Sequence, residues 1–334
     1  MSDPESIDLT VSEIGYLWSG YTINEMSRWY LMIFQQRVSD LDIKYLYSDA
    51  LEITNELIRR REHYLSKGDF PIPLGFSESD INKQAPALFS DRFILQYLYV
   101  GAQLGLSFHA RALATSTRSD VGDYMAECLI EAAQLSRRII DLLLRKGLYW
   151  RGPTIPSPKT QEVMHEQSYL NGWLGNTRPL NSIEIANLYS TMELLALIEA
   201  LCVGFAQTAE IDDVKEILLQ GSSVAEDQYS QLAQLLNNDS LPIPPTYIGE
   251  VTDCKERIFS DRLMVSHIGG LFGSLITLSG SSLGCVMEHD LIMIYTELHV
   301  KTGGYAEKIT KFMINQEWLE KIPGAIEREE LIHT

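Results

Sequence analysis

Two stretches decide the fold: Leu9-Thr10-Val11-Ser12-Glu13-Ile14 and Leu180-Asn181-Ser182-Ile183-Glu184-Ile185. In each, a residue that can cap a helix stands three positions before a glutamate, and an apolar pattern follows. This combination is the capping box that marks a helix N-terminus. The two stretches match each other position by position at a constant offset in residue number, which indicates an internal repeat.

Further matches follow in the same order along both halves. Three pairs keep an almost unchanged offset: Asp42-Ile43-Lys44 with Asp213-Val214-Lys215, Pro71-Ile72-Pro73 with Pro242-Ile243-Pro244, and Phe89-Ser90-Asp91-Arg92 with Phe259-Ser260-Asp261-Arg262. The offset falls by one between the second pair and the third. Towards the C-terminal ends we expect Met125 to match Met293 and Trp150 to match Trp318, at a slightly smaller offset. Collinear matches with a near-constant offset predict a duplicated unit.

Each copy is predicted to contain four helices. In the first copy they begin near residues 10, 40, 90 and 119, and Gly68 and Gly147 are expected to end the second and fourth. A proline-rich crossing over residues 70–84, repeated at 241–252, carries the chain from the second helix to the third. The sequence therefore predicts an all-α fold of two tandem, ferritin-like, up-down four-helix bundles related by internal duplication.

The predicted domains are residues 1–150 for copy 1 and 180–334 for copy 2. Residues 151–179 form a linker with several prolines and glycines, and its Tyr169 and Trp173 are expected to pack on the bundles. In copy 2 we expect Gly303-Gly304 to break or kink the fourth helix.

Composition excludes some classes of partner. The 334 residues include 27 basic and 45 acidic side chains, a formal net charge of -18. Nucleic acids and anionic lipids bind to basic patches, so neither is expected as a partner. The four cysteines form no CxxC pair, which is typical of free thiols in the cytoplasm. The acidic N-terminus does not resemble a secretory leader.

One segment resembles a membrane span. Residues 263–287 contain no Asp, Glu, Lys or Arg and exceed the ~20 residues that cross a bilayer. The segment also contains histidine, serines and several glycines. A helix buried within a bundle has the same pattern, so we expect a buried helix here.

A long four-helix bundle raises the question of a di-iron site. Such sites need Glu-x-x-His on two of the helices. This motif occurs at Glu162–His165 and at Glu330–His333, and neither lies on a predicted core helix. The standard di-metal site, any other cofactor and catalytic residues are therefore not expected.

Two other residues are candidates for a different site. Glu199 interrupts an apolar run, and His267 lies in the uncharged helix. If both point inward, they could hydrogen-bond to each other or bind one metal ion. The alternative is that each makes an ordinary polar contact inside the bundle.

The repeated Phe-Ser-Asp-Arg motif allows two interpretations. Asp91 and Asp261 could act as general bases, one in each copy. They could equally satisfy free backbone N–H groups near a helix start, which is the interpretation that we favour. The neighbouring Arg92 and Arg262 would then pair with an acid on a neighbouring helix, for which the repeated Glu13 and Glu184 are the candidates.

A resemblance to a known family rests on these residues together with others. The motifs are Thr177-Arg178-Pro179-Leu180-Asn181, Phe259-Ser260-Asp261-Arg262, Tyr305-Ala306-Glu307 and Trp318-Leu319-Glu320. The chain resembles a bacterial domain-of-unknown-function family from spore formers, near the coat-F-like spore-coat proteins. The resemblance implies ferritin-like bundles and a link to the spore coat or to stress, and it implies no activity.

We therefore expect a non-catalytic structural or interaction protein that binds an unknown protein partner or forms a homo-oligomer. The expected location is the cytoplasm, with the forespore or the spore coat as a special case. The alternative is a ligand- or metal-binding, redox-active bundle that lacks the standard di-iron motif.

Overall fold

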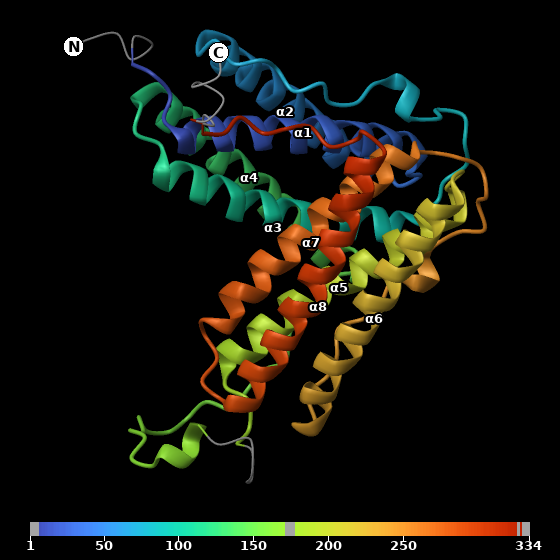
Figure 1. Ribbon diagram of the computed structural model, residues 1–334. Helices are drawn as coiled ribbons and strands as arrows, with labels where there is room; N and C mark the ends of the chain where they lie inside the picture. Colours follow the sequence, from blue (N-terminus) through green and yellow to red (C-terminus); the bar gives the residue numbers. More distant parts are fainter. Residues whose placement is uncertain (1–6, 171–177, 326–327, 329–334) are drawn as a thin grey trace.

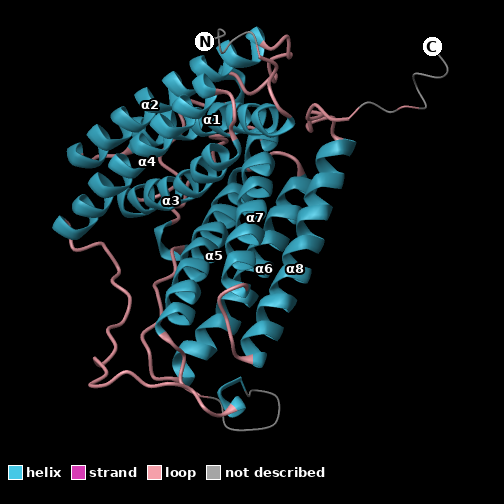
Figure 2. Ribbon diagram, turned by 90° about the vertical axis from the view of Figure 1, so that its left-hand side faces the viewer, coloured by secondary structure: helices cyan, strands magenta, loops and turns pink. Residues whose placement is uncertain are grey.

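The computed structural model describes residues 7–170, 178–325 and 328. Within these residues the chain is all-α and forms two tandem four-helix bundles, as the sequence predicts (Figures 1 and 2). The helices of copy 1 are α1 (Val11–Arg37), α2 (Leu41–Lys67), α3 (Asp91–Thr115) and α4 (Ser119–Arg145). Those of copy 2 are α5 (Ser182–Thr208), α6 (Asp212–Asn238), α7 (Asp261–Leu283) and α8 (His289–Asn315).

The two copies are in register along their whole length. The starts of α1 and α2 are related to those of α5 and α6 by one offset, and the starts of α3 and α4 to those of α7 and α8 by an offset smaller by one. The further decrease predicted for the C-terminal ends is therefore wrong. Trp318 corresponds to Leu148, and the backbone N–H groups of both close the same turn, onto Met313 and Leu143. Helix register follows burial, and an isolated match of residue type does not fix it.

Both predicted capping boxes are present. Thr10 donates its backbone N–H to Glu13 Oε2 at 2.7 Å. Asn181 does the same to Glu184 Oε2 at 2.9 Å. Each glutamate thus satisfies a backbone donor that the first helical turn leaves free.

The predicted break at Gly303-Gly304 is wrong, because α8 continues through both residues. Two helical glycines cost about 2 kcal/mol relative to alanine. The buried side chains that follow them, Tyr305 and Ile309, keep the last turns packed on the bundle. Burial of two large apolar groups outweighs this backbone cost.

The linker is mostly exposed between residues 154 and 168. Tyr169 is partly buried, and its ring lies 4.2 Å from the guanidinium carbon of Arg178. Tyr169 thus contacts a residue close to the start of α5, and the packing of the linker as a whole stays a prediction. Trp173 lies outside the described residues.

The two bundles lie crosswise and meet through their long connections (Figure 1). These connections contain the short helices η2 (Glu78–Asp80) and η4 (Ile248–Glu250). Ser260 donates its hydroxyl to Asp80 at 2.6 Å, and Ser90 donates its hydroxyl to Glu250 at 2.5 Å. The two serines are equivalent positions of the repeat, and so are the two acids. The same contact is therefore made twice, as it is across a two-fold axis.

A cluster of aromatic rings fills the centre of this interface. Both copies contribute to it, and its members are buried: Tyr30, Phe34, Phe89, Tyr97, Phe205, Phe259 and His267. The bundles consequently share one large core cluster, and copy 1 has a second, separate cluster around Tyr124.

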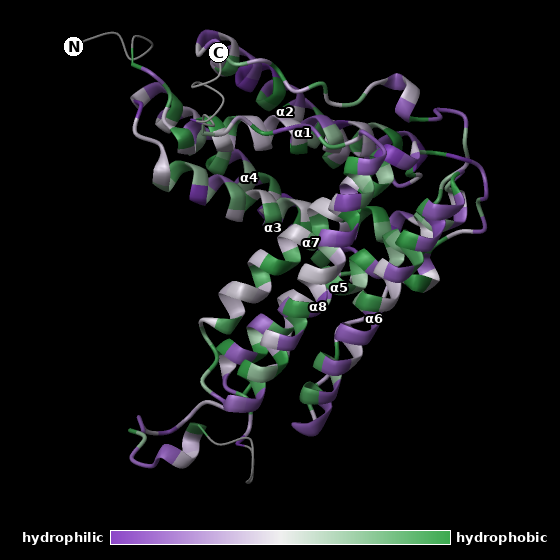
Figure 3. Cartoon of the chain, viewed as in Figure 1, coloured by the Kyte–Doolittle hydropathy of each residue, from purple (hydrophilic) through white to green (hydrophobic). Residues whose placement is uncertain are grey.

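Two described helices, α5 and α7, are long and apolar enough to cross a bilayer. In α5, 83% of the most apolar window is buried inside the protein, which is typical of a core helix. Helix α7 is half buried by the same measure, and most of its length is white or green in Figure 3.

Candidate functional site

The structure places the two predicted site residues in different surroundings. His267 lies on α7, where its Nε2 is 3.1 Å from the hydroxyl of Tyr97. Burial lowers the pKa of His267 to about 3, so the ring is neutral. Tyr97 and His267 are equivalent positions of the repeat, and they meet at the interface between the copies.

Glu199 lies on α5, in the core of copy 2. Burial, with a smaller contribution from Glu226, raises its pKa to about 7. Among the described residues, no hydrogen bond joins Glu199 to His267, and no group of three or more His, Cys, Asp or Glu side chains could hold a metal ion.

Asp91 and Asp261, the aspartates of the repeated motif, both accept hydrogen bonds from backbone N–H groups. Asp91 accepts hydrogen bonds from the N–H groups of Ser39 and Asp40, at 3.1 and 2.9 Å. Asp261 accepts the equivalent bonds from Glu210 and Ile211. Each ties the start of the third helix to the turn between the first two.

The predicted partners of Arg92 and Arg262 are wrong. Arg92 pairs with Glu250 at 3.2 Å, and Arg262 lies 3.9 Å from Glu320. Glu13 instead accepts hydrogen bonds from the turn between α3 and α4, and Glu184 pairs with Arg178 at 2.7 Å. The glutamates cap the start of the first helix, and the arginines lie at the start of the third. These two starts are at opposite ends of the bundle.

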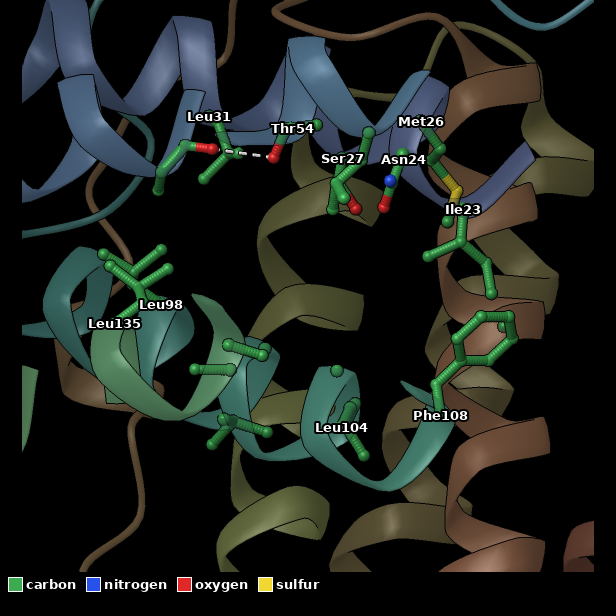
Figure 4. A pocket seen from close by; sticks show the side chains of 18 of the residues that line it. Ile23, Asn24, Met26, Ser27, Leu31, Thr54, Leu98, Leu104, Phe108 and Leu135 are labelled. Carbon is green, nitrogen blue, oxygen red and sulfur yellow. Dashed lines mark hydrogen bonds between the residues drawn. The ribbon is translucent and has the colours of Figure 1, made fainter. Parts of the chain in front are cut away.

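One hollow in the described structure was not predicted. A cavity of about 270 Å³ lies inside copy 1, between the helix pairs α1–α2 and α3–α4. Figure 4 shows Leu31, Leu98 and Leu135 at one end and Phe108 at the other, with α7 of copy 2 alongside. The wall is mostly apolar and includes exposed residues, among them Ile23, Gly101 and Gly270, through which the cavity reaches solvent. Its size is close to the lower end of the range for small-molecule pockets, about 300 Å³.

Small residues in copy 1 create this space, and larger residues stand at the same repeat positions in copy 2. The equivalent pairs are Ser27 and Ile198, Gly101 and Leu271, Ala102 and Phe272, Gly105 and Leu275, and Leu135 and Tyr305. In copy 2 all five of the larger side chains are buried, and one of them, Leu271, also lies on the wall of the cavity of copy 1. Comparison of the two halves of the sequence could have revealed this difference.

Charged and polar groups gather at the inner end of the cavity. His109 lines the wall, and its buried Nδ1 has no hydrogen-bond partner among the described residues. Burial and the nearby charge of Arg61 lower the pKa of His109 to about 4. Burial raises the pKa of the Cys128 thiol, which also lines the wall. This end of the cavity therefore presents the neutral imidazole of His109 and the neutral thiol of Cys128, with the charge of Arg61 nearby.

Arg61 is fully buried behind this end. Within the part of the chain that the structure describes, none of its three guanidinium nitrogens has a hydrogen-bond partner. An ideal Cβ on Gly20, a wall residue, would lie 2.5 Å from Arg61 Nε. The apolar pattern of α2 places Arg61 on the buried face of the helix, together with Leu57, Ile58 and Tyr64. A leucine, Leu232, stands at the same repeat position in copy 2.

Comparisons with other proteins agree with the duplicated fold. The family described as "protein of unknown function (DUF3231)" matches the chain twice, over residues 2–160 and 168–331. The search of curated proteins gives no match. Among solved structures, a protein of Bacillus halodurans C-125 that is provisionally assigned to the spore coat is similar, with 16% identity and a TM-score of 0.41. The match covers 45% of this chain and 98% of that one.

Proposed function

Because the chain belongs to the DUF3231 family, a family of unknown function, we propose from its geometry that it is a non-catalytic binding protein. Copy 1 holds a small, mainly apolar molecule in its cavity, and copy 2 serves as a rigid support. The ferritin-like relationship and the link to a spore coat or to stress remain predictions beside this proposal.

One observation carries the proposal: copy 1 has a hollow where copy 2 has larger, buried side chains at the equivalent positions of the repeat. Protein cores are close-packed, and a hollow that reaches solvent leaves its apolar wall exposed to water, at a cost of about 25 cal/mol per Å² of apolar surface. Copy 2 demonstrates that larger side chains fit the same backbone arrangement. A bound molecule that fills the space would offset the cost of the hollow.

The alternative of a metal-binding or redox site has less support. Among the described residues no set of metal ligands comes together, and His267 faces Tyr97, with no hydrogen bond to Glu199. An apolar wall with few polar groups is instead typical of small-molecule sites.

The test is a fluorescence titration of the full chain with N-phenyl-1-naphthylamine, a neutral apolar dye. We expect saturable binding of one dye per chain, and at least a ten-fold loss of affinity in Gly105→Leu, which introduces the leucine of copy 2 into the cavity. Gly304→Leu is the matched control, because Gly304 lies on α8 with open space around its Cβ position. Absence of saturable binding to the native chain, or unchanged affinity in Gly105→Leu, would overturn the proposal.

A further inference from the structure

Arg61 is the largest of the fully buried side chains. Its charge has no acid beside it among the described residues. Glu127 pairs with Arg60, Glu25 pairs with Arg28, and Glu62 accepts a hydrogen bond from Tyr21. A buried charge without a counter-charge costs several kcal/mol, so this arrangement is incomplete without an anion.

The guanidinium of Arg61 lies close to the cavity of copy 1. It lies against the Cα of Gly20 and 5.7 Å from the ring centre of Tyr124. Its charge also acts on His109 and Cys128. Gly20, His109 and Cys128 all line the cavity. The cation thus lies directly behind the part of the wall that these three residues form.

The fold itself does not require this cation. In copy 2 the residue equivalent to Arg61 is Leu232, and the residue equivalent to Gly20 is Thr191. Both are fully buried there. The arginine and the small residue opposite it occur together in the copy that has the cavity.

We propose that the molecule held in the cavity is an aliphatic monocarboxylate, whose chain lies along the apolar wall and whose carboxylate pairs with Arg61. The planar guanidinium presents two parallel N–H groups that match a carboxylate. The buried Nδ1 of His109 offers a further polar contact at the same end. This inference rests on the proposed binding function and adds the chemical class of the ligand.

The experiment compares decanoate with 1-decanol, which has the same chain length and no charge, by displacement of N-phenyl-1-naphthylamine from the full chain. We expect decanoate to bind at least ten-fold more tightly than 1-decanol. In Arg61→Leu the affinity for decanoate falls at least ten-fold, and the affinities for 1-decanol and for the dye stay the same. A charge-assisted hydrogen bond accounts for a change of this size. Arg59→Leu, at an exposed arginine two residues away, leaves all three affinities unchanged.

A second readout needs no ligand. Arg61→Leu should raise the melting temperature of the empty protein, because it removes an unpaired buried charge and introduces the residue found in copy 2. At one fixed concentration, decanoate should raise the melting temperature of the native chain more than that of Arg61→Leu, because the stabilisation by a ligand follows its affinity.

The outcomes separate the two proposals. Equal affinity of the native chain for decanoate and 1-decanol would overturn the carboxylate assignment, as would an equal loss of both in Arg61→Leu. In either case dye binding that is sensitive to Gly105→Leu would leave the binding function standing. If the native chain binds neither the dye nor the two aliphatic probes, both proposals are wrong.

Discussion

Gly20 and Arg61 lie against each other in copy 1, and neither residue is kept at the equivalent position of copy 2. A methyl group at position 20 would overlap the guanidinium, with 2.5 Å between Cβ and Nε. We therefore expect Gly20→Ala to lower the free energy of unfolding by about 1–3 kcal/mol. In an Arg61→Leu background the same substitution should cost little, because copy 2 accommodates Thr191 beside Leu232.

Urea denaturation of the four proteins of this double-mutant cycle measures the coupling between the two sites. Gly15→Ala is the matched control on α1, since nothing lies within 4 Å of its Cβ position. It should stabilise the helix by up to about 1 kcal/mol in both backgrounds. An equal cost of Gly20→Ala with arginine and with leucine at position 61 would contradict the contact.

Glu199 makes stability depend on pH. Its pKa is about 7 in the folded protein and about 4.3 in an unfolded chain. The unfolded state therefore loses this proton first, and the contribution of Glu199 to stability declines as the pH rises from about 4.5 to 7. We expect Glu199→Gln to raise the free energy of unfolding by about 1–3 kcal/mol at pH 8 and to change it little at pH 4.

Denaturant titrations at the two pH values test this difference. Asp227→Asn, at an exposed position of the neighbouring helix α6, should show no comparable pH dependence. If Glu199→Gln stabilises the protein equally at both pH values, the pKa of Glu199 is the same in the folded and the unfolded chain, and the prediction is wrong.

At the scale of the element, α8 shows how packing overrides a local signal. Gly303 and Gly304 have negative φ and lie within a continuous helix, with open space at both Cβ positions. We expect Gly303→Ala and Gly304→Ala each to raise the free energy of unfolding by about 0.5–1 kcal/mol, because alanine restricts the unfolded chain and favours the helix.

Thermal unfolding followed by circular dichroism measures the effect. The contrasting control is Gly147→Ala, where φ is 66° after the end of α4. There alanine should be destabilising, because an L side chain is strained in the left-handed region. Destabilisation by the two α8 substitutions would indicate that the helix bends at these residues.

At the scale of the whole molecule, the shared aromatic cluster should make both copies unfold together. Five of its rings come from α1 and α3 of one copy and α5 and α7 of the other, and Phe89 and Phe259 lie in the connections just before α3 and α7. We expect one transition in urea, with the same midpoint by tryptophan fluorescence, to which Trp18 and Trp29 of copy 1 contribute, and by circular dichroism.

Phe259→Ala removes a fully buried ring from this cluster. It should lower stability by about 3–5 kcal/mol and shift both signals together, although the residue belongs to copy 2. A shift of the circular dichroism signal alone, or two separate transitions in the native chain, would show that the copies are energetically independent.

The sequence by itself determined the helices, their caps and the duplication. Local rules suffice for these features: Thr10 with Glu13 and Asn181 with Glu184 mark helix starts, and an apolar pattern with spacings of three and four specifies the buried face. The near-constant offset between equivalent residues then gives two bundles of the same kind. These signals lie within one helix or compare one copy with the other, so no knowledge of tertiary contacts is needed.

Only the tertiary structure decided which side chains face one another inside each copy and between the copies. Whether the buried Arg61 finds a counter-charge, and whether the residues around Gly105 leave a hollow, depends on side chains from four helices that meet at one place. The meeting of Tyr97 with His267 depends likewise on how the two bundles cross. Helical periodicity gives the direction in which a side chain leaves its helix, but the packing between helices decides which residues it faces. Arg61 is a candidate binding group because it is buried without a partner among the described residues.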